Sequence, residues 1–180
     1  AAADADITLQ LTHLFKPLLK KNDVKELYEN IESETQIVLA EMEYNGINID
    51  KNKFRDLENE FTEKANKLKT EIFELAGSVF NLNSPKQLSE ILFDKLELPI
   101  IKKTKTGIST DSSVLEKLKK DYVIAQKIID YRTIDKLIGT YVRTIPELIN
   151  PYTNKVHTSF NQTVAITGRL SSSNPNLQNI

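Results

Sequence analysis

The side chains best suited to bind a ligand are basic ones in the segment 121–145. Arg132, Lys136 and Arg143 are separated by four and seven residues, so an α-helix would carry them on one face. Thr140 belongs to the same group. Such a face can follow a nucleic-acid duplex, because each cation neutralises a phosphate. Pairing with neighbouring aspartates along the helix explains the same pattern, and the residues alone leave both interpretations open.

A second basic cluster holds three lysines, Lys102, Lys103 and Lys105, with two threonines and a glycine. Ammonium groups, hydroxyls and a closely approachable backbone bind phosphate oxygens, but solvated lysine clusters without a ligand are commoner. The charge distribution also suggests an anionic partner, although solvated charged helices are the commoner explanation of such a distribution. Residues 100–143 carry ten Lys or Arg and five acidic residues, whereas residues 1–50 carry four Lys and ten acidic residues.

The tail 161–180 is nearly uncharged and surrounds the single guanidinium of Arg169 with short polar side chains. These are Asn161, Gln162, Ser171, Asn176, Gln178 and Asn179. Such groups reach the minor-groove acceptors of DNA, which vary little among base pairs. Polar loops of this composition also occur without a ligand, and the residues alone favour that simpler interpretation.

Metal-dependent chemistry has few candidate residues. Residues 151–180 contain no Asp or Glu, and Asp4 and Asp6 alone cannot hold two metal ions. His13 and His157 are isolated, and the absence of cysteine removes disulfides, thiolates and the common structural zinc sites. No apolar run of about 18 residues and no signal-peptide pattern is present, so we expect no membrane association and a cytoplasmic location.

Two long helices are predicted to position the basic residues. The first follows the N-cap Asp50 and ends before Gly77, and the second covers 121–145. Their apolar stripes are Phe54, Leu57, Phe61, Ala65, Leu68, Ile72 and Leu75, and Ile124, Tyr131, Ile134, Ile138, Tyr141, Val142 and Ile145. A helix of about 25 residues extends on the order of 38 Å, so each needs the other as a packing partner.

Between the long helices the sequence predicts a small helical tip. Ser84 caps a short helix over 85–94, residues 98–107 form an irregular or hairpin-like loop, and Thr110 or Asp111 caps another short helix.

The flanking segments are predicted to be two amphipathic helices and a strand. The first helix carries Ile7, Leu11, Leu14, Phe15 and Leu18 at helical spacing on one apolar side. The second, capped by Asn22 or Asp23, buries Val24, Leu27, Ile31, Val38 and Met42 and ends at Asn45-Gly46. An extended link over 47–49 follows, and Val156, Thr158 and Phe160 alternate as in a strand.

The segment 167–180 (TGRLSSSNPNLQNI) closely resembles the entry to the palm of family A DNA polymerases, and residues 157–163 (HTSFNQT) resemble the stretch before it. The similarity covers nearly the whole chain. It includes 83–88 (NSPKQL), 102–107 (KKTKTG), Tyr131-Arg132, Lys136-Leu137 and Thr140-Tyr141, and residues 2–6 (AADAD) resemble the last motif of a 3′–5′ exonuclease domain.

The resemblance implies a mainly α fold, in which two long antiparallel helices with a small helical tip form a polymerase thumb, followed by a short β or irregular palm segment. Residues 1–20 would end an exonuclease-like domain, 21–150 would be the thumb, and 151–180 would start the palm, before the catalytic motifs. Implied DNA-binding residues are Lys102, Lys103, Lys105, Arg132, Lys136, Thr140, Arg169, Ser171, Asn176, Gln178 and Asn179. Given this resemblance, DNA binding becomes the favoured interpretation of the basic helix face, the lysine cluster and the polar tail.

Two positions depart from the family pattern. Gly139 stands where the family often has a serine, which removes one hydroxyl contact and costs up to about 1 kcal/mol of helix propensity. Ala3 replaces the usual acidic residue before Asp4, so Asp4 is only a candidate metal ligand left from an exonuclease site.

The resemblance implies a parent DNA-directed DNA polymerase, a nucleotidyltransferase of replication and repair that uses Mg²⁺ and deoxynucleotide triphosphates. The present chain would grip double-stranded primer–template DNA through phosphates and the minor groove, without sequence specificity. It would be inactive by itself and hold no cofactor, because the polymerase carboxylates are absent from it. The alternative is a non-enzymatic helical protein-interaction module, which salt-sensitive duplex binding would exclude.

Overall fold

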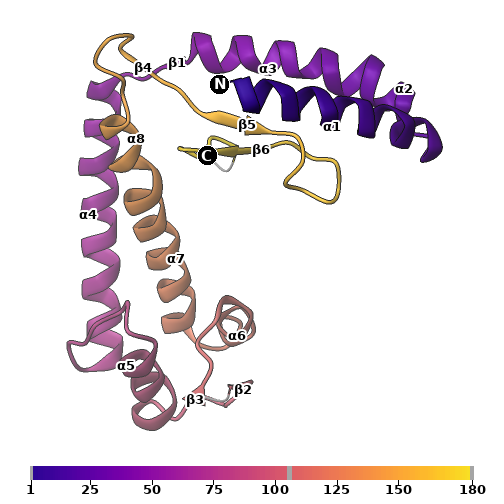
Figure 1. Ribbon diagram of the computed structural model, residues 1–180. Helices are drawn as coiled ribbons and strands as arrows, with labels where there is room; N and C mark the ends of the chain where they lie inside the picture. Colours follow the sequence, from indigo (N-terminus) through magenta and orange to yellow (C-terminus); the bar gives the residue numbers. More distant parts are fainter. Residues whose placement is uncertain (1, 105–106, 179–180) are drawn as a thin grey trace. The chain divides into compact units, whose positions relative to one another are not determined.

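The computed structural model describes residues 2–104 and 107–178, which form two compact units. The helix-pair unit is Asp50–Glu147, and the terminal unit combines the residues up to Ile49 with those from Leu148 onward. Both are mainly helical with short strands, which confirms the predicted fold class (Figure 1). Among the described residues, no helix is long and apolar enough to cross a membrane.

Helix α4 (Lys51–Ala76) begins and ends at the residues that the sequence predicts. The Asp50 carboxylate accepts hydrogen bonds from the backbone N–H groups of Asn52 and Lys53, at 2.9 and 3.2 Å. It thereby satisfies two of the amides that a helix start leaves unpaired. Gly77 ends the helix at a φ of +63°, a left-handed conformation that glycine adopts without steric cost.

The returning helix covers the predicted segment but is not α-helical throughout. Helix α7 (Val123–Leu137) passes into the π-helical turn η3 (Ile138–Val142) and then into α8 (Thr144–Glu147). The Arg143 N–H donates to the carbonyl oxygen of Ile138, five residues earlier, at 3.0 Å. Because a π turn holds more residues than an α turn, side chains after η3 are rotated relative to those before it.

Helices α4 and α7 run side by side, and the core of the helix-pair unit lies between them and the tip (Figure 1). The core residues with at most 2% of their surface exposed include Ile72, Leu88, Leu92, Leu115, Leu118 and Ile128. Each such side chain contributes roughly 1.5–3 kcal/mol relative to an exposed one. Of the predicted stripes, Leu57 and Leu75 are exceptions, since both remain exposed.

The tip consists, in chain order, of α5 (Pro85–Ser89), η2 (Glu90–Lys95), β2 (Lys103–Thr104), β3 (Gly107–Ile108) and α6 (Ser112–Leu118). Strands β2 and β3 pair antiparallel, so the hairpin-like loop is confirmed. Ser84 caps α5 by accepting from the Gln87 N–H at 3.4 Å. Asp111, rather than Thr110, caps α6 by accepting from the Val114 N–H at 3.0 Å.

The terminal unit contains α1 (Ala2–Lys21), α2 (Lys25–Leu27), η1 (Tyr28–Glu32), α3 (Ser33–Asn45), β1 (Ile47–Asn48), β4 (Lys155–Val156), β5 (Ser159–Asn161) and β6 (Ser171–Ser173). Strand β1 pairs antiparallel with β4, which places Ile47 opposite Val156. Strand β5 pairs antiparallel with β6, which places Phe160 opposite Ser172. The predicted extended link is present as β1. The strand predicted over 156–160 is instead two short strands, because β4 pairs with β1 and β5 pairs with β6, and Thr158 lies between them.

The predicted cap of the second terminal helix is wrong. The N-cap residue is Val24, which makes no side-chain cap hydrogen bond. Asn22 Nδ2 instead donates to the Leu18 carbonyl oxygen at 2.8 Å, and Asp23 turns the chain at a φ of +58°. Asn and Asp suit the end of one helix as well as the start of the next, so their type does not identify the helix that they cap.

The apolar sides of both terminal helices are exposed, including the side of the second helix that was predicted to be buried. Helix α1 buries no side chain. The ten predicted positions keep 36–58% of their surface accessible: Ile7, Leu11, Leu14, Phe15, Leu18, Val24, Leu27, Ile31, Val38 and Met42. The burial prediction is therefore wrong for the five residues of the second helix, because helical periodicity identifies an apolar side without supplying the surface that covers it.

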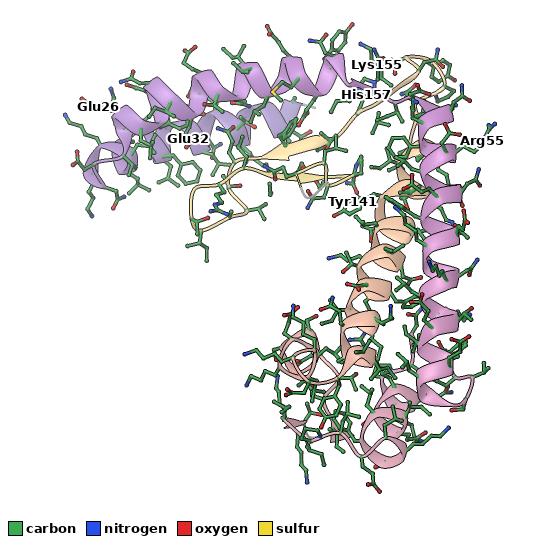
Figure 2. All side chains as sticks on the ribbon, turned by 180° about the vertical axis from the view of Figure 1, so that it is seen from behind. Glu26, Glu32, Arg55, Tyr141, Lys155 and His157 are labelled. Carbon is green, nitrogen blue, oxygen red and sulfur yellow. The ribbon has the colours of Figure 1, made fainter. Side chains whose placement is uncertain are left out.

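Lys155 and His157 close the C-terminal end of α3, where Figure 2 shows them together. Lys155 Nζ donates to the Asn45 carbonyl oxygen at 2.8 Å, and His157 Nδ1 donates to that of Glu43 at 2.7 Å. Both bonds satisfy carbonyls at the negative end of the helix dipole. Gly46 is required beside them, because a Cβ at this position would lie 2.8 Å from the His157 ring.

We expect Gly77→Ala to lower the free energy of unfolding by about 1 kcal/mol, because alanine is disfavoured at a φ of +63°. Gly139→Ala is the matched control. It lies in a helical segment, and a Cβ there would meet no atom within 4 Å, so this change should stabilise the chain by up to about 1 kcal/mol. Urea unfolding followed by circular dichroism measures both changes, and equal signs would contradict this account.

Candidate nucleic-acid interface

Arg132 lies where α7 meets the tip. Its Nη1 donates to the Thr110 carbonyl oxygen at 2.6 Å, and its side chain is half-buried. Burial lowers the pKa of Arg132, whereas the negative charge of Asp111 raises it. A guanidinium has five N–H donors and stays protonated in proteins. Arg132 can therefore tie the tip to α7 and still offer charged donors to a ligand.

Lys102 and Lys103 differ in their surroundings. Lys102 Nζ pairs with Asp111 Oδ2 at 2.7 Å, whereas Lys103 is exposed on β2. Lys105 lies outside the described residues. The side chains of the Lys102–Asp111 pair are 53% and 40% exposed, so the pair is weak enough for a phosphate to compete for the lysine.

Lys136 is the cation of α7 that is most available to an outside anion. It is exposed, and none of the ion pairs within 2–104 and 107–178 includes it. Lys127 of the same helix differs, because it pairs with Glu71 of α4 at 2.7 Å. Thr140 is exposed within η3.

Arg143 was expected on the same face as Arg132 and Lys136, and this expectation is wrong. Its Nε donates to Glu58 Oε1 of α4 at 2.7 Å. The π turn η3 between Lys136 and Arg143 removes the α-helical spacing on which the expectation depended. Arg143 therefore joins the two long helices to each other.

A cavity of about 710 Å³ lies in the tip beside Arg132. Its lining includes hydroxyl-bearing and charged residues: Ser84, Lys86, Ser89, Glu90, Thr104, Ser109, Thr110 and Asp111. Hydroxyls and cations next to a guanidinium suit phosphate oxygens. The sequence predicts Ser84 and Thr110 only as helix caps. The sequence feature that indicates this polar lining is the high proportion of Ser and Thr in residues 104–110.

The predicted residues of the tail lie around β6 in the terminal unit. Arg169, Asn176 and Gln178 are exposed, Ser171 is half-buried, and Asn179 lies outside the described residues. Asn176 is not a freely rotating group, because its Oδ1 accepts hydrogen bonds from the Ser172 hydroxyl and the Gln178 N–H, both at 3.1 Å.

Two further polar residues of the tail are engaged inside the unit. Asn161 Nδ2 donates to Ser173 Oγ at 3.2 Å, and Gln162 Nε2 donates to the Glu32 carboxylate at 2.6 Å and to its backbone carbonyl at 3.0 Å. The Asn161 bond joins β5 to β6, and the Gln162 bonds hold the chain after β5 against η1. The amide nitrogens of Asn161 and Gln162 therefore have partners inside the unit, and a contact of these residues with a ligand stays a prediction.

The described residues do not fit a polymerase or exonuclease metal site. Among them, no group of three His, Cys, Asp or Glu side chains is close enough to hold a metal ion. Asp4 lies on α1, and the carboxylate of the nearby Asp6 accepts from Gln10 Nε2 at 2.8 Å. Two-metal chemistry needs several converging carboxylates, so we derive no catalytic step from this chain.

Comparisons with known proteins agree over most of the chain. Residues 51–180 match the family model described as DNA polymerase family A. DNA polymerase I of Caldicellulosiruptor bescii is 50% identical over 163 residues, which are 91% of this chain and 19% of that protein. The thermostable DNA polymerase I of Thermus aquaticus is 50% identical over 156 residues, 86% of this chain and 19% of that protein.

A solved structure is also similar. The POL domain of Pol1 from M. smegmatis, in complex with DNA primer-template and dNTP, matches 96% of this chain and 30% of its own, with a TM-score of 0.83 and 38% identity. The chain thus spans about a fifth of the length of the curated relatives and under a third of this solved chain.

We expect Asp111→Asn to lower the thermal unfolding midpoint at pH 7, because asparagine can still cap α6 but cannot pair with Lys102. The hydrogen bond from Lys102, followed by those from Ser113 and the Val114 N–H, holds the pKa of Asp111 well below its ordinary value of 3.8. A carboxylate whose pKa is lower in the folded state than in the unfolded state stabilises the folded chain at pH values above its unfolded-state pKa. This contribution is lost as the pH falls towards its folded-state pKa.

The difference between wild type and Asp111→Asn should therefore shrink as the pH falls below 3.8. Asp111→Ala should be less stable than Asp111→Asn at pH 7, because it also removes the helix cap. Thermal unfolding from pH 7 to pH 3 measures both effects. A wild-type advantage of constant size over this range would contradict the role of the charge.

Proposed function

This chain belongs to DNA polymerase family A, and from that membership we propose that it is the part of a DNA-directed DNA polymerase that holds the primer–template duplex. The observation that carries the proposal is the basic surface of the helix-pair unit, with exposed Lys136 and Thr140 and the half-buried Arg132 beside the hydroxyl-lined cavity. Contacts of this kind bind phosphates irrespective of sequence.

In this proposal, residues 21–150 act as the thumb, 1–20 end an exonuclease-like domain, and 151–180 begin the palm. Lys103 binds phosphate at the tip. Lys102 also binds phosphate there, after the phosphate replaces Asp111 as its partner. Arg169, Ser171, Asn176 and Gln178 contact the duplex through its minor groove, where acceptors are present at every base pair. The duplex is therefore held without sequence specificity.

The whole protein, in this proposal, adds nucleotides in DNA replication and repair in the cytoplasm, with Mg²⁺ and deoxynucleotide triphosphates. The similar POL domain of Pol1 from M. smegmatis, in complex with DNA primer-template and dNTP, supports the duplex and the deoxynucleotide triphosphate as ligands. Because residues 151–180 contain no carboxylate, catalysis is assigned to parts of the protein other than this chain.

Duplex binding by the 180-residue chain should weaken in Lys136→Ala about three- to tenfold at low salt, with the salt slope reduced by about one. Lys127→Ala is the matched control, because Lys127 is on the same helix but is paired with Glu71, and it should leave affinity within about twofold. Fluorescence anisotropy of a labelled primer–template at several salt concentrations measures both. Equal effects of the two changes would contradict the proposed surface.

Primer extension provides a second test. The 180-residue chain should incorporate no nucleotide with Mg²⁺ and all four deoxynucleotide triphosphates, even at concentrations that saturate duplex binding. The reason is that residues 2–104 and 107–178 contain no cluster of carboxylates that could hold the metal ions of two-metal catalysis. A full-length family A polymerase on the same primer–template is the positive control. Extension by the purified chain would show that the assignment of catalysis elsewhere is wrong.

A helical protein-interaction module is the second candidate function. The exposed apolar side chains of α1 and α3, among them Leu14, Phe15 and Val38, favour it. Binding through such a surface depends little on salt, whereas phosphate contacts weaken steeply. Stoichiometric, salt-insensitive association with a protein, together with no duplex binding, would replace the polymerase proposal by this one.

A further inference from the structure

The buried hydroxyl of Ser172 accepts one hydrogen bond and donates another. The residue is 5% exposed, on β6 opposite Phe160 of β5. Its Oγ accepts from the Leu177 N–H at 2.9 Å and donates to Asn176 Oδ1 at 3.1 Å. A carboxamide oxygen can only accept, so in the bond to Asn176 Oδ1 the Ser172 hydroxyl is the donor.

The same network defines which end of the Asn176 carboxamide points inward. The Gln178 N–H reaches this carboxamide at 3.1 Å, and a backbone N–H can only donate. The atom that it meets must therefore be Oδ1. With Ser172 and Gln178 both donating to Oδ1, its two acceptor positions are occupied. Nδ2 makes no hydrogen bond to any residue within 2–104 and 107–178.

A second buried hydroxyl holds the backbone of the same turn. Thr158, 7% exposed, has its Oγ1 within hydrogen-bond distance of the carbonyl oxygens of Ser173 and Pro175, at 3.0 and 2.6 Å. The turn that carries Asn176 is therefore fastened on one side by Thr158 and on the other by Ser172. A side chain held in this way keeps one orientation when a ligand approaches.

We propose that Ser172 is a positioning residue, which holds the Asn176 carboxamide with its oxygen inward so that only the Nδ2 hydrogens face a ligand. The ligand is then a hydrogen-bond acceptor of the duplex, and this inference rests on the proposed function. Two acceptors share this chemistry, the minor-groove N3 and O2 atoms of the bases and the oxygens of the phosphate backbone. An asparagine turned the other way would present an oxygen to these acceptors and would bind neither.

The orientation can be tested without DNA. In Ser172→Ala, the NMR order parameter of the Asn176 Nδ2 group should fall from about 0.85 towards 0.6 or below. The reason is that Asn176 Oδ1 loses the hydrogen bond from Ser172 and keeps only the one from the Gln178 N–H. Ser173→Ala is the matched control, since its hydroxyl accepts from Asn161 and does not touch Asn176. An order parameter unchanged by Ser172→Ala, or lowered equally by Ser173→Ala, would overturn the positioning role.

Duplex affinity then tests whether Ser172 acts through Asn176. We expect Ser172→Ala to weaken primer–template binding about fivefold in the wild-type background and less than about twofold in the Asn176→Ala background. Asn176→Asp keeps both inward hydrogen bonds but loses the outward donors, so it should bind at least as weakly as Asn176→Ala. Equal effects of Ser172→Ala in both backgrounds would mean that the hydroxyl only supports the fold.

Modified duplexes identify the acceptor. If Nδ2 donates to base atoms, 3-deazapurines together with pyrimidine analogues that lack O2 near the primer end should abolish the effect of Asn176→Ala. If it donates to phosphate, methylphosphonate linkages there should abolish it. If Asn176→Ala still weakens binding to both modified duplexes, the proposal that Nδ2 donates to an acceptor near the primer end is wrong. Absence of wild-type duplex binding would overturn the proposed function and the duplex as ligand, whereas the order parameters would still decide the orientation of Asn176.

Discussion

The length of α4 is the constraint on which the helix-pair unit depends. A helix of 26 residues extends about 39 Å, and its apolar stripe cannot be covered by a compact cluster of side chains. A second helix of similar length must run beside it, and α7 with η3 and α8 does so. The tip then fills the remaining end of the core with residues such as Leu88, Leu92 and Leu115. The outer side of α7 is left for polar and charged residues.

The charges of this unit serve two roles, which depend on their partners. Lys127 and Arg143 reach across to Glu71 and Glu58 of α4, so they join the two helices. Lys136 is exposed and makes no ion pair with a described residue, and Arg132 donates to Thr110 and lines the cavity. Since exposed ion pairs contribute little to stability, the helix pair owes its stability mainly to its core and can keep its remaining cations for an anionic ligand.

Hydrogen bonds to buried or capping groups organise the polar residues in both units. Asp111 combines a helix cap with the pair to Lys102, and Ser172 combines a bond to the backbone with one to Asn176. In each case a short side chain holds a longer one in place. Such arrangements depend on which atoms point inward, and residue type alone does not contain that information.

The sequence by itself determined the helix pair, its caps at Asp50 and Ser84, the hairpin at the tip and the family, because apolar spacing, capping chemistry and short motifs act over a few residues. It did not determine that Arg143 faces α4, since a π turn in place of an α turn is a response to packing. Nor did it determine the exposure of Leu14 and Val38 or the orientation of Asn176. Those properties were decided by the tertiary structure, because each depends on which distant surface or donor the fold brings to the side chain.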